Sequence, residues 1–336
     1  MKTIGVLTSG GDAPGMNAAI RSIVRAAAYM GMTVKGIKRG YNGLIENNIV
    51  DLDIRSVSDI IQRGGTVLYT ARCPRFTTEE GMQEAIKNCK VNGIEGLVII
   101  GGDGSFRGAR DLSLKGIPCI GIPGTIDNDI PSTEYTIGFD TAMNTVVEMV
   151  DKLRDTACSH ERCSVVEVMG HGAGDIALQS GLAVGATAII VPEIGFDLQN
   201  VIDKILETQK NGRNHFIIVV SEGLCDATQL ARQLQESTGI ETRATILGHI
   251  QRGGNPTLRD RVVASKMGYA AVELLSKGVG NRVIGLKDNK IVDYDIFEAL
   301  SLKNKTFREE VKKSAKKQGT QKCQKIFTSN GKCDII

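Results

Sequence analysis

The stretch Leu97-Val98-Ile99-Ile100-Gly101-Gly102-Asp103-Gly104-Ser105 joins a run of four apolar residues to a glycine-rich turn that holds one acid. An apolar run bounded by glycines is typical of a buried β-strand. Further along, Pro118–Ile122 has the same character and leads into Pro123-Gly124-Thr125-Ile126-Asp127-Asn128-Asp129, which places two carboxylates two residues apart. Because ligands of parallel sheets bind beyond the carboxyl ends of strands, these two turns predict a site at one sheet edge.

Short β-branched runs alternate with helical patterns along the rest of the chain. Strands are expected at Ile4–Thr8, Val34–Ile37, Leu97–Ile100, Cys119–Ile122, Val165–Val168, Ala188–Val191, Phe216–Val220, Thr245–Leu247 and Val283–Leu286. Helices are expected at Gly15–Ala28, Glu79–Lys90, Asn144–Asp155, Ala173–Ala183, Leu198–Gln209, Ala227–Glu236 and Leu258–Leu275. This alternation predicts an α/β fold with two Rossmann-like lobes, in which mainly parallel sheets are flanked by helices. The active site is expected in the cleft between the lobes.

The two expected lobes each combine separate parts of the chain. Residues 1–138 together with 256–303 form the first lobe, and residues 139–255 together with 304–320 form the second. Residues 321–336 are expected to form a basic, flexible tail. From Lys303 onward ten Lys and Arg stand against three Asp and Glu, a local charge of +7 that leaves −4 for the rest of a chain whose total is +3. A solvated terminus explains such a run, so no nucleic-acid partner is expected.

Composition indicates a soluble globular protein. Of 336 residues, 41% are hydrophobic and 24% charged, and no apolar run approaches the ~18 residues of a membrane span. The first seven residues indicate a strand rather than a signal peptide, so we expect a cytoplasmic protein with no membrane partner. The eight cysteines show no C-x-x-C spacing, which gives no support to zinc or thioredoxin-like chemistry.

Two glycine-rich turns are candidates for phosphate binding. Thr8–Asn17 holds three glycines directly after the first strand and before a helix, whose N-terminal N–H groups can face an anion. That turn alone fits a plain turn equally well. In Gly101–Gly108, Asp103 lies among glycines that leave it unshielded, which suits a cation bridging nucleotide phosphates. The alternative for Asp103 is a cap on the next helix.

The acid pair in Thr125–Asp129 is a candidate for proton transfer. A lone aspartate in a loop is usually a turn residue. Asp127 and Asp129 repel each other, so a bound cation or a proton-transfer role is expected to offset that cost. A carboxylate here can take a proton from an attacking hydroxyl.

Cationic and acidic side chains elsewhere are weaker candidates. A lone arginine is most often a solvated surface residue, and this reading stays open for Arg72, Arg162 and Arg243. His249 and Arg252 lie between glycine turns, where arginine can bind a phosphate through two hydrogen bonds. Glu222 follows a predicted strand and can accept hydrogen bonds from sugar hydroxyls, or it lies near a helix N-terminus.

With these residues in view, the chain resembles the bacterial ATP-dependent 6-phosphofructokinases, the phosphofructokinase A family. The resemblance extends from about Lys2 to about Ala299, and its most distinctive runs are Gly5–Arg21, Gly101–Ser105, Pro123–Asp129, Asp155–Thr156, Val165–Gly170 and Arg243–Gly254. It implies transfer of the γ-phosphoryl group of ATP to O1 of fructose 6-phosphate, which gives fructose 1,6-bisphosphate and ADP in the committing step of glycolysis. The first lobe would bind ATP and the second would bind the sugar phosphate.

The resemblance also implies roles for individual residues. Asp127 would be the general base, with Thr125 and Arg72 stabilising the transferring group and Asp129 nearby, and Asp103 would serve Mg²⁺. The nucleotide would be lined by Gly11, Tyr41, Arg72, Cys73, Gly102, Asp103, Gly104, Ser105 and Gly108. The sugar phosphate would be bound by Thr125, Ile126, Asp127, Arg162, Met169, Gly170, His171, Glu222, Arg243, His249, Ile250, Gln251 and Arg252. In this family Arg162 and Arg243 come from a neighbouring subunit of a homotetramer.

Two glycines favour ATP over pyrophosphate as the donor. The pyrophosphate-dependent relatives carry Asp where this chain has Gly104, and Lys where it has Gly124. An aspartate would fill and repel the α-phosphate region. A pyrophosphate-dependent enzyme is the alternative within this class, and a non-catalytic sugar-phosphate sensor on the same fold is the alternative outside it.

Several positions depart from the family pattern. The family's Val-Met-Gly-Arg becomes Val168-Met169-Gly170-His171, which replaces a guanidinium by a shorter imidazole. The effector site for ADP or phosphoenolpyruvate would correspond to Arg21, Arg25, Arg55, Asp59, Arg154, Gly185, Thr187 and Arg213. There, Ile54 and Asn211 replace basic residues and Thr187 replaces an acid, so the effector site has lost charged groups of the family pattern.

Overall fold

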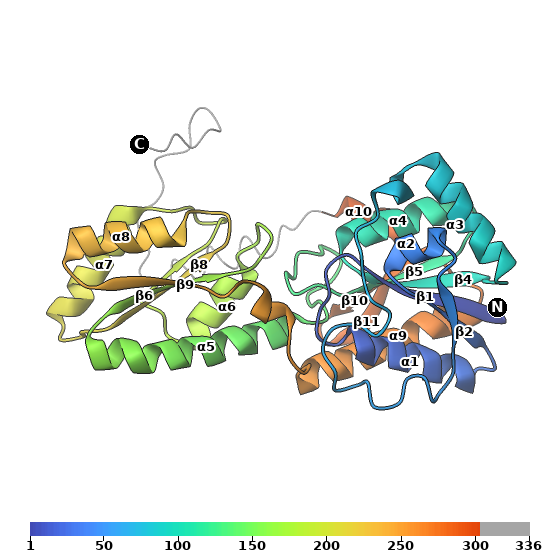
Figure 1. Cartoon of the computed structure of the whole chain (residues 1–336), viewed down its shortest axis with the longest axis horizontal. Helices are drawn as coiled ribbons and strands as arrows, with labels where there is room; N and C mark the ends of the chain where they lie inside the picture. Colours follow the sequence, from blue (N-terminus) through green and yellow to red (C-terminus); the bar gives the residue numbers. More distant parts are fainter. Residues whose placement is uncertain (303–336) are drawn as a thin grey trace.

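The computed structural model describes residues 1–302, and their strands form two sheets that lie in separate lobes (Figure 1). The seven-stranded sheet has the order β11-β10-β5-β4-β1-β2-β3, and the four-stranded sheet has the order β7-β8-β6-β9. The predicted α/β class with mainly parallel sheets is confirmed. Residue 303 of the predicted first lobe, the segment 304–320 predicted for the second lobe and the predicted tail 321–336 lie outside the described residues.

The larger sheet is parallel except at its two edges. Its strands are β1 (Thr3–Ser9), β2 (Thr33–Ile37), β3 (Ile49–Leu52), β4 (Gly96–Gly101), β5 (Cys119–Pro123), β10 (Arg282–Lys287) and β11 (Lys290–Asp295). The edge strands β3 and β11 pair antiparallel with β2 and β10. Neither was predicted, because an edge strand is half exposed and lacks the continuous apolar run of a buried one.

Helices cover both faces of this sheet. On one side lie α1 (Met16–Tyr29) and α9 (Leu258–Ser276), and on the other lie α2 (Gly40–Ile45), α3 (Glu79–Val91), α4 (Asp103–Leu114) and α10 (Ile296–Ser301). Side chains alternate along β4 accordingly. Val98 and Ile100 pack toward α1 and α9, whereas Leu97 and Ile99 pack toward the other helices. A strand that is buried on both faces must be apolar throughout, as this one is.

The smaller sheet is wholly parallel and also has helices on both faces. Its strands are β6 (Cys163–Val168), β7 (Ala188–Ile190), β8 (Phe216–Ser221) and β9 (Thr242–Ile246). Helices α5 (Phe139–His160) and α6 (Asp175–Ala183) cover one face, and α7 (Leu198–Lys210) and α8 (Ala227–Thr238) cover the other. Strand β9 begins three residues before the prediction, and α5 extends beyond the predicted Asn144–Asp155 at both ends.

The strand orders create a switch point in each sheet. From β1 the chain passes to α1 on one face, whereas from the adjacent β4 it passes to α4 on the opposite face. Strands β6 and β8 diverge in the same way toward α6 and α8. Such points open a crevice at the carboxyl ends of the strands. Within residues 1–302, no helix has the length and apolarity needed to cross a bilayer.

Candidate active site

The switch point of the first lobe is formed by the loops that follow β1 and β4. The hydroxyl of Ser105 donates to the carbonyl of Ser9 at 3.1 Å, which ties the two loops together. A Cβ atom at Gly101 would lie 2.5 Å from both of these oxygen atoms, so only glycine fits between the strands here. The close approach leaves the N-terminus of α4 facing the crevice, where its N–H groups can bind a phosphate.

Asp103 is the first residue of α4 and is partly exposed at the crevice. Its carboxylate accepts a hydrogen bond from Arg107, one turn along the helix, at 2.8 Å. A Cβ atom at Gly102 or Gly104 would meet nothing within 4 Å. The carboxylate therefore borders open space that could hold a nucleotide and its cation. The alternative role as a capping residue is not seen, because Gly102 occupies the N-cap position.

Tyr41 lies behind this loop rather than on the open crevice. Its side chain is buried against Phe76, its hydroxyl donates to the carbonyl of Ser105 at 2.6 Å, and burial raises its pKa. A Cβ atom at Gly108 would lie 2.8 Å from the Tyr41 ring. Tyr41 thus stabilises the first turn of α4 from the buried side of the loop.

Asp127 is held by the loop that follows β5. The Thr125 hydroxyl donates to Asp127 Oδ2 at 3.1 Å and accepts the Asp127 N–H at 3.2 Å. Asn128 has a left-handed backbone conformation, and its side-chain oxygen accepts the Thr136 N–H at 3.0 Å. The Thr136 hydroxyl in turn donates to the Thr125 carbonyl at 2.6 Å. The loop geometry is therefore fixed by its own hydrogen bonds.

The surroundings of Asp127 favour its protonated form. Its side chain is 6% exposed, and burial is the main cause of its raised pKa. The neighbouring carboxylate of Asp129 raises the pKa further, while Arg252, Thr125 and His171 oppose the shift. Oδ1 is buried and has no hydrogen-bond partner among the described residues. A carboxylate with a raised pKa and a free oxygen is suited to accept a proton.

The second lobe presents two loops whose conformations depend on buried side chains. Glu222 Oε1 accepts the N–H groups of Gly170 at 3.1 Å and His171 at 2.9 Å. Gln251 is fully buried, accepts the Met169 N–H at 3.2 Å and donates to the Gly248 carbonyl at 3.0 Å. Gln251 thus positions the loops with its side chain, and only its backbone can reach a ligand. Glu222 Oε1 likewise positions a loop, because it is bound to the backbone N–H groups of Gly170 and His171.

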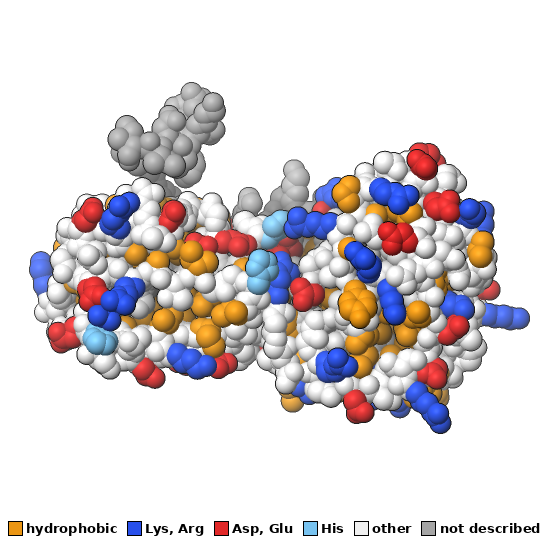
Figure 2. All heavy atoms as spheres, in the orientation of Figure 1, with side chains coloured by type: hydrophobic (Ala, Val, Ile, Leu, Met, Phe, Trp, Pro, Cys, Tyr) orange, Lys and Arg blue, Asp and Glu red, His pale blue; other side chains and the backbone are white. Residues whose placement is uncertain are grey.

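Side chains of the second lobe reach across the cleft to the first. Arg252 donates to the Asp12 carbonyl at 3.1 Å, and a Cβ atom at Gly11 would lie 2.3 Å from its guanidinium. His171 Nδ1 lies 3.4 Å from Asp129 Oδ2. Figure 2 shows histidine, basic and acidic side chains gathered at the junction of the lobes. The structure therefore brings the motifs after β1, β5, β6 and β9 together at one cleft.

The remaining predicted residues near the cleft differ in exposure. Arg72, His249 and Ile250 are exposed, whereas Cys73 and Met169 are partly buried. Ile126 lies entirely in the hydrophobic core, so a ligand could meet only its backbone. For Ile126 and Gln251, whose side chains are fully buried, the prediction holds for the position of the loop and not for a binding side chain.

Arg162 and Arg243 lie at the amino ends of strands in the second sheet, on the side away from the cleft. Both donate to the exposed carboxylate of Glu241, at 2.7 Å and 2.8 Å respectively. Arg162 directly precedes β6 and Arg243 is near the start of β9, so both are at the amino ends of these parallel strands. Six strand residues at about 3.3 Å each separate that edge from the cleft by roughly 20 Å. Within one chain these arginines do not meet Asp127.

The predicted effector residues fall into two groups in different lobes. Arg21 and Arg25 lie on α1, and Arg55 and Asp59 follow β3 in the same lobe, whereas Arg154 (on α5), Gly185, Thr187 and Arg213 lie in the second lobe. A cavity of about 370 Å³ beside Arg213 also includes His215, whose pKa is lowered by burial and by nearby Arg213 and Arg154. Thr187 is buried, and its hydroxyl accepts the Ile217 N–H at 3.4 Å.

Asp260, which is not among the predicted residues, links α9 to the segment leading into α5. Its fully buried carboxylate accepts hydrogen bonds from the Tyr135 hydroxyl at 2.5 Å, the Gly138 N–H at 2.8 Å, and the N–H and hydroxyl of Thr141 at 2.9 and 2.5 Å. The only local signal was an acid three residues after Thr257, which caps α9. The partners lie more than 100 residues away, so no local pattern could reveal them.

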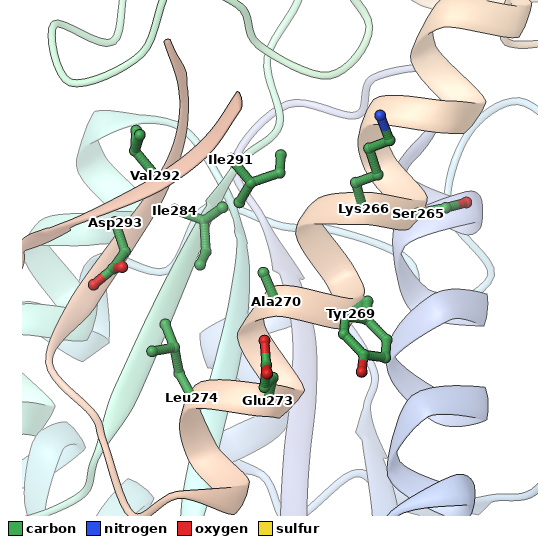
Figure 3. Close-up of a pocket in the computed structure, with 10 residues that line it drawn as sticks. All are labelled: Ser265, Lys266, Tyr269, Ala270, Glu273, Leu274, Ile284, Ile291, Val292 and Asp293. Atoms are coloured by element: carbon green, nitrogen blue, oxygen red, sulfur yellow. The ribbon is translucent and has the colours of Figure 1, made fainter. Parts of the chain in front are cut away.

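A further cavity lies away from these groups. Between α9 and the β10–β11 hairpin there is a groove of about 540 Å³, lined by Tyr269, Ala270, Leu274, Ile284 and Ile291 among others (Figure 3). It contains none of the predicted site residues. The candidate active site is therefore the cleft between the lobes.

The fold and the cleft together define a two-lobed α/β protein whose glycine-rich loops and helix N-terminus suit a phosphorylated ligand. A family model described as phosphofructokinase matches residues 3–275. The chain is 59% identical over 302 residues to the ATP-dependent 6-phosphofructokinase of Clostridium acetobutylicum and 57% identical over 304 residues to that of Bacillus velezensis, in both cases covering 90% of this chain and 95% of the relative. The chain therefore belongs to the phosphofructokinase family, as the sequence predicted.

Solved structures show the same fold. Phosphofructokinase from Saccharomyces cerevisiae superposes with a TM-score of 0.83 at 33% identity, over 95% of this chain and 47% of that chain. This chain thus spans about half the length of the yeast protein. A pyrophosphate-dependent phosphofructokinase from Marinobacter aquaeolei shares the fold with a TM-score of 0.82 at 21% identity, over 91% of this chain and 86% of that one.

Proposed function

We propose that this protein transfers the γ-phosphoryl group of ATP to O1 of fructose 6-phosphate. The observation that carries the proposal is the buried Asp127 carboxylate, with one free oxygen, at a cleft between a glycine-rich switch point and the second lobe. Names of relatives at 57–59% identity support ATP and fructose 6-phosphate as the substrates. ADP and fructose 1,6-bisphosphate would be the products.

Asp127 acts as the base in this proposal. Its free oxygen accepts the proton of the O1 hydroxyl, because an alcohol is a poor nucleophile until it loses that proton. Thr125 holds the other carboxylate oxygen and so fixes the direction from which the hydroxyl must approach. Arg252 crosses the cleft beside Asp127 and Gly11, where its charge can bind the 6-phosphate of the sugar. Arg72, which is exposed, would stabilise the transferring phosphoryl group together with Thr125.

Asp103 is the residue that would hold Mg²⁺. Its carboxylate at the start of α4 and the open space beside Gly102 and Gly104 fit a hydrated cation that accompanies nucleotide phosphates. When bound, Mg²⁺ neutralises charge on the phosphates. The chain's own contribution is the N-terminus of α4 and the loops after β1 and β4, which orient the triphosphate toward Asp127.

A homotetramer with shared sites completes the proposal. Arg162 and Arg243 lie at the sheet edge far from the cleft, so they would bind the sugar 6-phosphate only in the site of a neighbouring subunit, alongside His249 and Arg252 of that subunit. The two groups of effector residues would likewise meet across a subunit boundary, where they would bind ADP or phosphoenolpyruvate. The cytoplasmic location stays a prediction.

The experiment is a comparison of phosphoryl donors. The purified protein is incubated with fructose 6-phosphate, Mg²⁺ and either ATP or pyrophosphate, and the products are identified by ³¹P NMR. We expect fructose 1,6-bisphosphate and ADP with ATP, and no turnover with pyrophosphate. Turnover with pyrophosphate alone would reverse the choice of donor. Binding of the sugar phosphate without turnover of either donor would favour a sensor.

A further inference from the structure

Three possible metal ligands from two lobes meet in the cleft. Asp127 and Asp129 lie on the loop after β5, and His171 lies on the loop after β6. Each offers one ligand atom, and these atoms lie within 4.8 Å of one another. Donor atoms that share an ion at bond lengths of about 2.0–2.2 Å lie roughly 3–4 Å apart. The 3.4 Å separation of His171 Nδ1 and Asp129 Oδ2 already meets this requirement.

The Asp127 side chain supplies independent evidence for a ligand. It is 6% exposed, and its Oδ1 is buried without a hydrogen-bond partner among residues 1–302. A buried oxygen with no partner costs free energy. Asp129 adds a second negative charge nearby, so a cation would both satisfy the oxygen and offset the repulsion.

Both loops are positioned before any ligand arrives. The His171 N–H donates to Glu222, and the backbone of His171 has a φ of 51°. Asn128 lies between the two acids with a φ of 53°, and its side chain is bound to Thr136. The ligands therefore lie on a backbone that other residues hold, as preorganised metal sites require.

The donor set selects a particular class of ion. One imidazole nitrogen with two carboxylates suits Zn²⁺, Co²⁺ and related first-row ions, whereas Mg²⁺ prefers oxygen donors alone. The family pattern has arginine in place of His171, and arginine has no lone pair to donate. The nitrogen ligand is therefore a property of this chain.

We propose that Asp127, Asp129 and His171 bind one divalent transition-metal ion, such as Zn²⁺ or Co²⁺, separately from the Mg²⁺ expected at Asp103. The ion bridges the two lobes, because its ligands come from both. The ion also binds the carboxylate of Asp127, which the proposed function assigns as the base. Binding therefore inhibits phosphoryl transfer, and a chelator reverses the inhibition.

The test is a titration of chelator-treated, nucleotide-free, full-length protein with Co²⁺, followed by calorimetry. We expect one Co²⁺ per chain in this cleft, with affinity at least about tenfold weaker in His171→Arg and His171→Asn. Asparagine tolerates positive φ, so it guards against misfolding of the arginine variant. His160→Asn, at the exposed end of α5, is the matched control and should bind as the wild type does. Equal Co²⁺ affinity in the wild type and His171→Asn would overturn the site.

A second measurement separates the metal site from the proposed function, on which the inhibition rests. Initial rates are measured with excess Mg²⁺ and ATP while Co²⁺ is added. We expect inhibition of the wild type at concentrations at least about tenfold lower than for His171→Asn. Binding by calorimetry without inhibition would leave the metal site intact and contradict the role of Asp127 as base.

Discussion

Asp127 combines burial, a nearby like charge and a free oxygen, and each is costly for stability. Burial and Asp129 make its ionised form unfavourable, whereas the proposed reaction needs that form to accept a proton. The hydroxyl of Thr125 and the guanidinium of Arg252 only partly offset this cost. At the scale of one residue, activity and stability therefore make opposite demands.

Asp127→Ser should lower kcat by about 10²–10⁴-fold with a much smaller change in KM, because it removes the base and leaves the binding groups in place. The measurement is a coupled assay of ADP release under saturating substrates. Asp151→Ser, at an exposed position on α5, serves as the control. A wild-type kcat in Asp127→Ser would eliminate Asp127 as the base.

Asp127→Asn should raise the thermal unfolding midpoint at neutral pH, by about 2 °C. The folded pKa of Asp127 is raised, so the wild type loses stability as pH rises from the unfolded value of about 3.9 through the folded pKa, and asparagine avoids that loss. The difference between the two proteins should shrink as pH falls toward the unfolded value. Scanning calorimetry in EDTA-containing buffers at several pH values tests this, and a constant difference across that range would contradict it.

Gly104→Asp should weaken ATP binding at least about tenfold, because a carboxylate beside phosphates is repelled. A Cβ atom at Gly104 meets nothing within 4 Å, so the unfolding midpoint should stay unchanged. Gly108→Asp is the contrasting variant, since its side chain would collide with Tyr41 and should destabilise the protein. Unchanged KM for ATP in Gly104→Asp would place the nucleotide elsewhere.

Helix α9 and the start of α5 are joined through one buried carboxylate. Asp260, near the N-terminus of α9, accepts hydrogen bonds from Tyr135, Gly138 and Thr141. Since α9 packs on the first sheet and α5 on the second, this contact fixes the point where the chain passes from one lobe to the other. The relative position of these two helices, and with it the geometry of the cleft, therefore depends on the hydrogen bonds of Asp260.

Asp260→Ala should lower the free energy of unfolding by about 3 kcal/mol or more, because it leaves several buried donors without an acceptor. Chemical denaturation followed by circular dichroism measures the change. Asp260→Asn keeps one acceptor oxygen and should lose less. An alanine variant as stable as the wild type would show that these hydrogen bonds contribute little.

In the whole molecule, the predicted phosphate-binding arginines lie at opposite ends of the strands of the second sheet. Arg252 lies at the cleft, whereas Arg162 and Arg243 pair with Glu241 at the opposite edge. A single chain cannot unite them, so the proposed site requires a second copy.

Mixing two impaired variants tests that requirement. Asp127→Ser lacks the base and Arg243→Ala lacks a phosphate ligand, but a hybrid oligomer would contain sites with Asp127 from one subunit and Arg243 from another. We expect the refolded mixture to show several-fold more activity, at low fructose 6-phosphate, than either variant alone. Activity equal to the average of the two variants would mean that each site belongs to one chain.

The central strands and the loops of the candidate site follow from the amino-acid order, because both depend on local chemistry. Apolar runs such as Leu97–Ile100 can only be buried, and glycine turns with acids can only follow them at the sheet edge. The family resemblance added the activity and predicted roles for individual residues. The burial of Ile126 and Gln251, the link that Asp260 makes between the lobes and the approach of His171 to Asp129 follow only from contacts in the folded chain. Those contacts join residues far apart in the chain, and no local pattern encodes such distances.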